Sequence, residues 1–194
     1  MKKQNIAVIY HSVTGATEKL AHAVADGIRS VESVEASPIA IVGTDIHAGR
    51  YTNNTTFEAV DAADGVIFGS PTYMGCVSAQ FKAFADASGE RWAGKRWAGK
   101  VAAGFTIGSN FSGDQLNTIQ YLNIFASQHG MIWTSLDVPG GYDTEGKNRL
   151  GAQSGLIAQS HNANIDPLDL KTAHYLGARV ARLSKVIANS GEKI

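Results

Sequence analysis

Three hydroxyl side chains and a glycine lie close together near the start of the chain, in the segment Ser12-Val13-Thr14-Gly15-Ala16-Thr17. Hydroxyls can donate hydrogen bonds, and Gly15 lets the backbone approach an anion closely. An apolar run, Ile6–Tyr10, precedes this segment, and a helical pattern follows it. Because a helix N-terminus presents free N–H groups and the positive end of its dipole, the arrangement predicts a phosphate site.

The same segment contains no lysine or arginine. A helix N-terminus carries only about half a unit charge, so a phosphate held here would depend on many hydrogen bonds rather than on an ion pair. The loop of nucleoside triphosphatases needs Gly-Lys-Ser/Thr, which is absent from this stretch. The segment therefore excludes that chemistry, and a plain helix cap is the alternative interpretation.

Two later strands are expected to end in loops of the same kind. The apolar run Gly65–Gly69 continues into Ser70–Gly75, and Val101–Ile107 leads into Gly108-Ser109-Asn110. Ligands of open α/β sheets bind outside the carboxyl ends of the strands. Three such loops, Ser12–Thr17, Ser70–Gly75 and Thr106–Gly113, are therefore expected to converge on a phosphate-bearing aromatic ligand.

Strand and helix patterns alternate about five times along the chain. This alternation predicts an α/β fold, a doubly wound five-stranded parallel sheet with helices on both faces, in one domain over residues 1–194. The expected strands are Asn5–Tyr10, Val34–Val42, Gly65–Gly69, Val101–Ile107 and Met131–Leu136. The expected helices are Glu18–Arg29, Phe57–Ala63, a helix capped by Ser78, Asp114–Gln128 and one opening at Asp166-Pro167. Loops are expected at Gly43–Thr56 and over a long glycine-rich connection, Pro139–Asn164.

The composition narrows the class of protein. With 17 basic and 17 acidic residues the chain has no net charge, and a nucleic-acid binder usually has a basic excess. The lone Cys76 excludes an internal disulfide and fits a reducing compartment. The apolar run after Lys2-Lys3 is too short for a signal peptide, and no stretch reaches the roughly 18 apolar residues of a membrane span. A cytoplasmic protein that neither inserts into membranes nor binds nucleic acid is expected.

A five-residue stretch occurs twice in succession, as Arg91–Lys95 and Arg96–Lys100. Its period is far below that of any solenoid repeat, so we interpret it as a duplication within a loop. The two tryptophans, Trp92 and Trp97, are candidates for loop packing or for subunit contacts.

Several of these motifs resemble those of a known family. Ser12–Thr17 resembles the Ser/Thr-x-Thr-Gly-x-Thr phosphate loop of flavodoxins. Ser70–Gly75, Gln80-Phe81-Lys82 and Gln128-His129-Gly130-Met131 resemble a narrower group, the WrbA-type NAD(P)H:quinone oxidoreductases and related flavodoxin-like FMN proteins. The similarity extends from about Ile6 to Leu183, and the three loops in this order are a specific combination.

The resemblance implies which residues contact FMN. The phosphate is expected to be held by the first loop: Ser12, Val13, Thr14, Gly15, Ala16 and Thr17. The isoalloxazine is expected to be wrapped by the second loop: Pro71, Thr72, Tyr73, Met74 and Gly75. The other edge of the flavin is expected to meet the third loop: Thr106, Ile107, Gly108, Ser109, Asn110 and Phe111. The substrate pocket is expected to include Trp92 and Gln128.

The resemblance also implies the activity. FMN would carry the chemistry, passing a hydride from NAD(P)H to a quinone-type acceptor, with no catalytic side chain and no metal. In the family the nicotinamide or quinone stacks on the flavin between subunits, so a homo-oligomer, a dimer or tetramer, is expected. Two alternatives stay open, a flavodoxin-type one-electron carrier and a flavin-binding regulatory or protein-interaction module.

Four residues depart from the family pattern. Bulky Ile107 and Phe111 stand in a loop that is often Ser-Thr-Gly-Thr-Gly-Gly, Gln128 stands where the family has a histidine beside the ring, and Met74 replaces a phenylalanine. These changes leave the preferred electron acceptor open.

Overall fold

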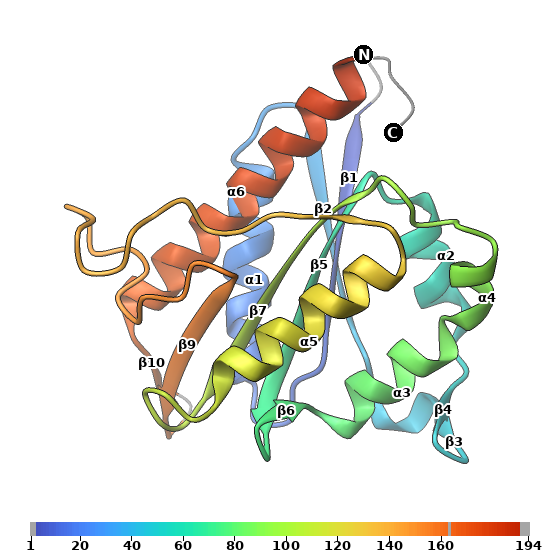
Figure 1. Ribbon diagram of the computed structural model, residues 1–194, viewed down its shortest axis with the longest axis horizontal. Helices are drawn as coiled ribbons and strands as arrows, with labels where there is room; N and C mark the ends of the chain where they lie inside the picture. Colours follow the sequence, from blue (N-terminus) through green and yellow to red (C-terminus); the bar gives the residue numbers. More distant parts are fainter. Residues whose placement is uncertain (1–2, 163, 191–194) are drawn as a thin grey trace.

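A central sheet with helices on both faces forms the body of the molecule (Figure 1). The computed structural model describes residues 3–162 and 164–190. Neighbouring strands follow the order β10-β9-β7-β5-β1-β2. The five principal strands, all parallel, are β1 (Gln4–Tyr10), β2 (Val34–Ala40), β5 (Gly65–Tyr73), β7 (Val101–Gly108) and β9 (Leu156–His161). Shorter strands are β6 (Cys76–Val77), β8 (Ile132–Trp133) and β10 (Asn164–Ile165), and β3 (Ile46–His47) pairs with β4 (Arg50–Tyr51) in a separate hairpin.

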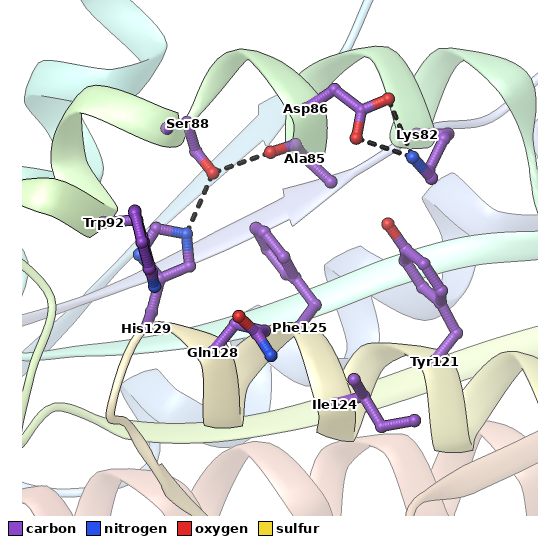
Figure 2. A pocket seen from close by; sticks show the side chains of 11 residues that line it. Lys82, Ala85, Asp86, Ser88, Trp92, Tyr121, Ile124, Phe125, Gln128 and His129 are labelled. Atoms are coloured by element: carbon purple, nitrogen blue, oxygen red, sulfur yellow. Dashed lines mark hydrogen bonds and ion pairs between the residues drawn. The ribbon is translucent and has the colours of Figure 1, made fainter.

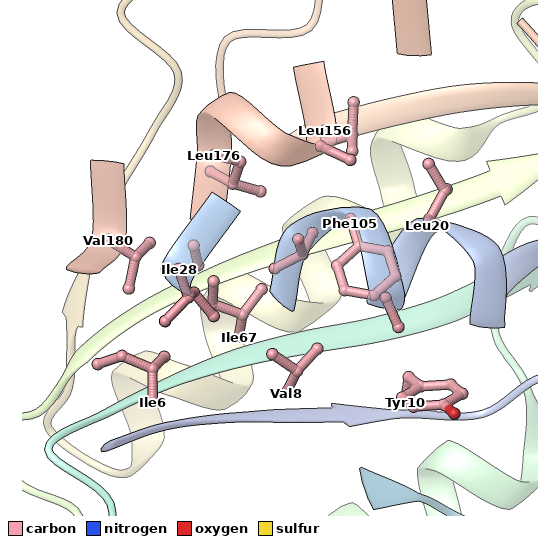
Figure 3. Close-up of a cluster of buried hydrophobic side chains, with 14 of the residues drawn as sticks. Ile6, Val8, Tyr10, Leu20, Ile28, Ile67, Phe105, Leu156, Leu176 and Val180 are labelled. Carbon is pink, nitrogen blue, oxygen red and sulfur yellow. The ribbon is translucent and has the colours of Figure 1, made fainter. Parts of the chain in front are cut away.

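The helices divide between the two faces of the sheet. One apolar cluster joins the sheet to α1 (Ala16–Arg29) and α6 (Pro167–Ser190) (Figure 3). The other joins it to α2 (Asn54–Ala62), α3 (Ala79–Ala87) and α5 (Gln115–Gln128). A short helix, α4 (Gly89–Ala93), follows α3, and a 3-10 turn, η1 (Gly43–Asp45), precedes the hairpin. The predicted α/β fold with a five-stranded parallel core is confirmed.

Strand β1 shows why its sequence is apolar throughout. Ile6, Val8 and Tyr10 face the first cluster, whereas Ala7 and Ile9 face the second. Successive side chains of a strand point to opposite faces, so a strand covered on both sides needs apolar residues at every position. Pro38 lies in β2 at the edge of the sheet, as its missing N–H predicts.

The first and last helices of the chain touch backbone to backbone. A Cβ atom at Gly27 would lie 1.9 Å from the carbonyl oxygen of His174, and one at Gly177 would lie 2.0 Å from that of Val24. Any side chain at either glycine would therefore force α1 and α6 apart. The helix that begins at the first loop is thus fixed by a close contact with α6.

The fifth strand differs from the prediction. The expected strand Met131–Leu136 is reduced to β8, which pairs with the first two residues of β7, and β9 pairs with the last four. The chain leaves the sheet between these pieces, where Leu136 donates its N–H to Gln153 instead of to β7. The prediction of an unbroken connection over Pro139–Asn164 was therefore wrong, because Leu156–His161 completes the sheet.

Smaller differences concern loops. Residues 43–56 contain η1, the β3–β4 hairpin and the first turn of α2, which begins early because the Asn53 side chain accepts a hydrogen bond from the Thr55 N–H. Part of the duplicated stretch is helical, in α4. In the part of the chain that the structure describes, no helix is both long enough and apolar enough to cross a membrane.

Candidate functional site

The three predicted loops converge on one cleft at the carboxyl edge of the sheet. The cleft has a volume of about 180 Å³. It is lined by Val13, Thr14, Ala16 and Thr17 from the first loop, Pro71, Thr72 and Tyr73 from the second, Ile107, Gly108 and Ser109 from the third, and Ser160 from β9. Ten predicted contact residues therefore meet in one place.

The first loop has the geometry of an anion cradle. Gly15 caps α1 with a left-handed φ of 84°, and a Cβ built there would meet nothing within 4 Å. The Ser12 hydroxyl accepts a hydrogen bond from the Glu18 N–H at 3.3 Å, which leaves its proton free to donate. The first N–H groups of α1, from Ala16 and Thr17, have no intrahelical acceptor by helix geometry. The residues present therefore fit a phosphate group.

The second loop is an extension of strand β5 and not an open loop. Thr72 pairs with Val77 and Tyr73 with Cys76, so Met74 and Gly75 form the two-residue turn of a hairpin. Their φ angles of 48° and 78° are both positive, as a type I′ turn requires. The turn holds the Met74 side chain fully in solvent, and Met74 and Gly75 do not line the cleft.

The third loop presents its residues in two directions. Ile107, Gly108 and Ser109 face the cleft. Phe111 instead lines a second cavity of about 600 Å³, where the Arg149 guanidinium lies 5.9 Å from its ring centre. Bulky Phe111 is thus turned away from the cleft, so it does not narrow the space between the loops.

The third loop is tied to the N-terminal end of α6. Arg149 makes two hydrogen bonds of 2.8 Å to the buried carboxylate of Asp169, and the Gln159 N–H donates to the same carboxylate at 3.0 Å. The Gln159 side chain then donates to the Ser109 carbonyl at 2.9 Å. Burial raises the pKa of Asp169 above its usual value, and the Arg149 hydrogen bonds offset only part of that rise. These bonds fix the position of Ser109 at the cleft.

Four predicted residues have other surroundings. Thr106 is completely buried, and its hydroxyl donates to the Ser70 carbonyl at 2.7 Å. Ser12 and Gly15 lie beside the cleft lining as part of the helix cap, and Asn110 is exposed and accepts a hydrogen bond from Gln115. Conversely, Ser160 and Gln159 were not among the predicted contact residues. Recognising the apolar run Leu156–Ala158 as a strand would have placed both at the carboxyl edge of the sheet.

Trp92 and Gln128 lie elsewhere on the molecule. They line a cavity of about 440 Å³ between the C-terminal ends of α3 and α5, together with Tyr121, Phe125 and His129 (Figure 2). Helix α5 begins beside the third loop and spans 14 residues, so about 21 Å separates its two ends. The structure therefore brings Trp92 and Gln128 together but, within one chain, not to the loops.

His129, next to Gln128, is neutral in this cavity. It is 5% exposed, and burial lowers its pKa to about 4. Its Nε2 lies 2.9 Å from the Ser88 Oγ (Figure 2). The single Ser88 proton already goes to the Ala85 carbonyl, so His129 must carry its proton on Nε2 and donate it. Packing against Trp97, with ring centres 4.2 Å apart, completes its burial.

Comparison with known proteins agrees with this geometry. Residues 5–138 match the family described as NADPH-dependent FMN reductase. The chain belongs to the NADPH-dependent FMN reductase family. FMN and NAD(P)H are the cofactors of this family of flavoproteins, and the expected flavodoxin-like fold and WrbA-type relationship are confirmed.

Individual relatives of this FMN reductase family member cover nearly the whole chain. It is 34% identical to "Flavodoxin FldP" of Pseudomonas aeruginosa, over 92% of this chain and 95% of the relative. It is 33% identical to a "NAD(P)H dehydrogenase (quinone)" of Archaeoglobus fulgidus, over 93% of this chain and 97% of the relative. Among solved structures, a "flavodoxin, WrbA-like protein" from Agrobacterium tumefaciens superimposes with a TM-score of 0.74 at 40% identity, over 94% of this chain and 98% of that one.

Proposed function

We propose that this chain is an FMN-dependent oxidoreductase that passes a hydride from NAD(P)H to a quinone-type acceptor. One observation carries the proposal: the cleft where the three loops meet is lined by hydroxyls, small residues and backbone, and the Tyr73 phenol is the only titratable group among its lining residues. Such a lining can bind and orient a cofactor, but it offers no general base or nucleophile. When bound, FMN supplies the hydride chemistry.

The loops have separate roles in this proposal. The first loop binds the phosphate through the hydroxyls of Ser12, Thr14 and Thr17 and through the first N–H groups of α1. Pro71, Thr72 and Tyr73 orient the ring from one side, and Ile107 to Ser109 do so from the other. Met74, fully exposed at the tip of the β5–β6 hairpin, is free to cover the ring, and a flexible methionine suits that task.

Anaerobic addition of NADH or NADPH to the FMN-loaded protein tests the proposal. The flavin absorbance should bleach, and a quinone added afterwards should restore it. A flavin that stays oxidised in the presence of either nucleotide contradicts the proposal. A flavin that bleaches but is not reoxidised by quinones would retain the NAD(P)H step and overturn the quinone step alone.

The phosphate loop has a matched pair of variants. Gly15→Val puts a branched side chain into the open space at the head of α1 and should abolish FMN retention. Gly49→Val is the control, since Gly49 also has a positive φ, 78°, with open space around its Cβ position, but it lies in the β3–β4 hairpin. Equal FMN loss in both variants would mean that backbone strain, not the phosphate site, is responsible.

We propose further that Trp92 and Gln128 line the acceptor pocket. Because about 21 Å of helix α5 separates them from the third loop, they can reach a flavin only in another copy of the chain. This requires a homo-oligomer, a dimer or a tetramer. Trp92→Ala should then raise the KM for the quinone without weakening FMN binding, and an unchanged KM contradicts the assignment.

A one-electron carrier is the second candidate function, since one relative, 34% identical, is named a flavodoxin. Such a carrier stabilises the one-electron-reduced flavin. A reductive titration that accumulates this form, combined with slow bleaching by NAD(P)H, would favour the carrier over the hydride-transferring enzyme.

A further inference from the structure

The first turn of α5 holds the second and third loops at three points. The Gln115 side-chain N–H donates to the Asn110 carbonyl at 2.9 Å, and that of Asn117 donates to the Gly75 carbonyl at 2.7 Å. The Thr118 hydroxyl lies 2.9 Å from the Thr72 hydroxyl. Gln115 and Thr118 are both completely buried. Polar side chains are seldom buried so fully in a helix without a specific hydrogen-bonding role.

The hydroxyls around Thr72 form a chain with one direction. Thr106 donates its only proton to the Ser70 carbonyl at 2.7 Å. It can therefore only accept from Thr72, whose hydroxyl oxygen is 2.8 Å away. With its proton committed to Thr106, Thr72 must accept from Thr118. The direction runs from α5 through β5 and β7: Thr118 to Thr72, Thr72 to Thr106, and Thr106 to the Ser70 carbonyl.

This direction determines whether the Thr72 hydroxyl is a hydrogen-bond donor or an acceptor toward a ligand in the cleft. Thr72 is partly exposed and lines the cleft. Its proton points inward to Thr106, and one lone pair is used by Thr118, so the remaining lone pair is an acceptor. The isoalloxazine ring of oxidised FMN has one N–H donor, at N3, which such an acceptor can bind. Thr106 itself, fully buried with its proton committed inward, acts only through Thr72.

We propose that Thr118 is a positioning residue, which fixes the Thr72 hydroxyl as a hydrogen-bond acceptor for the flavin ring and joins the second loop to α5. This inference rests on FMN binding in the cleft, as in the proposed function. Thr118 does not itself line the cleft, and it contacts the lining residue Thr72, so its effect on a bound flavin must pass through Thr72.

The test compares FMN binding to four apoprotein variants by fluorescence titration, with the visible spectrum and midpoint potential of each complex. Thr118→Val keeps the shape and removes the hydroxyl, so FMN should bind about tenfold more weakly, the loss expected for one buried hydrogen bond. Thr118→Ser should restore binding to within about twofold, because it returns the donor. Thr72→Val combined with Thr118→Val should bind no more weakly than Thr72→Val alone, since both act through one group.

Thr56→Val is the matched control. Thr56 is also a buried helical threonine whose hydroxyl pairs with another hydroxyl, that of Tyr51 at 2.7 Å, but it lies in α2. It should leave FMN affinity and the spectrum unchanged. If Thr118→Val does not fold, Asn117→Ala on the exposed side of the same turn should weaken binding by about threefold through loss of the Gly75 contact.

Three results would overturn the inference. Thr118→Val could bind FMN as the unmodified protein does, Thr118→Ser could fail to restore binding, or the double variant could show two additive losses. Failure of the unmodified protein to bind FMN is a different outcome, because it overturns the proposed function itself.

Discussion

Two copies of the same five residues have opposite environments in this molecule. In the first copy, Trp92 is 54% exposed, whereas Trp97 in the second is completely buried. The arginines are reversed. The Arg91 side chain is 11% exposed and lies over the Phe57 ring, and that of Arg96 is 58% exposed. Identical sequence therefore produces two different local structures.

The backbone between the copies explains the reversal. Helix α4 ends at Ala93, and Lys95 has a left-handed φ of 51°. The second copy therefore leaves the helix and turns its tryptophan inward, where the indole N–H donates to Asp61 at 2.7 Å. Lys100 then reaches the C-terminal end of α2, while Lys95 is exposed. The second copy therefore builds the core, and the first is available for contacts.

Removing each tryptophan should give the largest contrast. Trp97→Ala should lower the free energy of unfolding by about 3–5 kcal/mol, because it leaves a large cavity in the core. Trp92→Ala should change it by less than about 1 kcal/mol. Urea denaturation followed by circular dichroism measures both, and Trp97→Phe provides a milder variant if Trp97→Ala does not fold. Similar losses at the two positions would contradict the assigned roles.

Lowering the pH should destabilise the folded protein through His129, which packs on Trp97 of the second copy. Its pKa is about 4 in the folded protein, below the usual 6.5, so the unfolded chain binds the proton more tightly. Stability is then complete above pH 6.5 and falls as the pH drops toward 4, by roughly 2 kcal/mol at pH 5. Thermal unfolding between pH 7 and pH 4.5 checks this. His129→Gln should flatten the profile, and an equally steep profile in that variant would contradict the prediction.

The two lysines of the repeat, Lys95 and Lys100, should differ in their contribution to the free energy of unfolding. The Lys100 ammonium donates to the carbonyls of Val60, Asp61 and Ala63, each at 2.7 Å. Lys100→Met leaves these carbonyls without that donor and should cost about 1–3 kcal/mol. Lys95→Gly should be neutral or stabilising by up to about 1 kcal/mol, because glycine adopts a positive φ without strain. Chemical denaturation of the two variants measures the difference, and a costly Lys95→Gly would show that Lys95 makes a structural contact.

The arginines should show the smallest contrast and reverse the order of the tryptophans. Arg91→Leu should cost about 1–2 kcal/mol through loss of its contact with Phe57 and of its pairing with Asp61. Arg96→Leu should cost less than about 0.5 kcal/mol, because its ion pair with Asp61 is exposed. A double-mutant cycle with Asp61→Asn separates the two pairings. A larger cost at Arg96 than at Arg91 would refute the reversed environments.

The sequence predicted the fold and the three loops because their signals are local. Apolar strands that run into small, hydroxyl-bearing loops place residues such as Thr14 and Thr72 at the carboxyl edge of the sheet without any knowledge of distant contacts. The N-cap role of Ser78 was equally local, and its side chain accepts from the Phe81 N–H as expected.

What could not be predicted depends on contacts between distant parts of the chain. Strands β8 and β9 are aligned only because both pair with β7. The long segment between them separates them along the chain, so the sequence does not reveal this alignment. Thr118 has no neighbour in sequence that reveals its hydrogen bond to Thr72. The two tryptophans have the same local sequence, so only the folded chain separates the core residue from the exposed one.

The close crossing of the first and last helices has a consequence for synthesis. Because Gly27 and Gly177 bring α1 and α6 into backbone contact, the helix that follows the first loop lacks this partner until α6 has left the ribosome. The cleft between the three loops therefore gains this support only once α6 has been synthesised, and a chain that stops before α6 would carry all three loops without it.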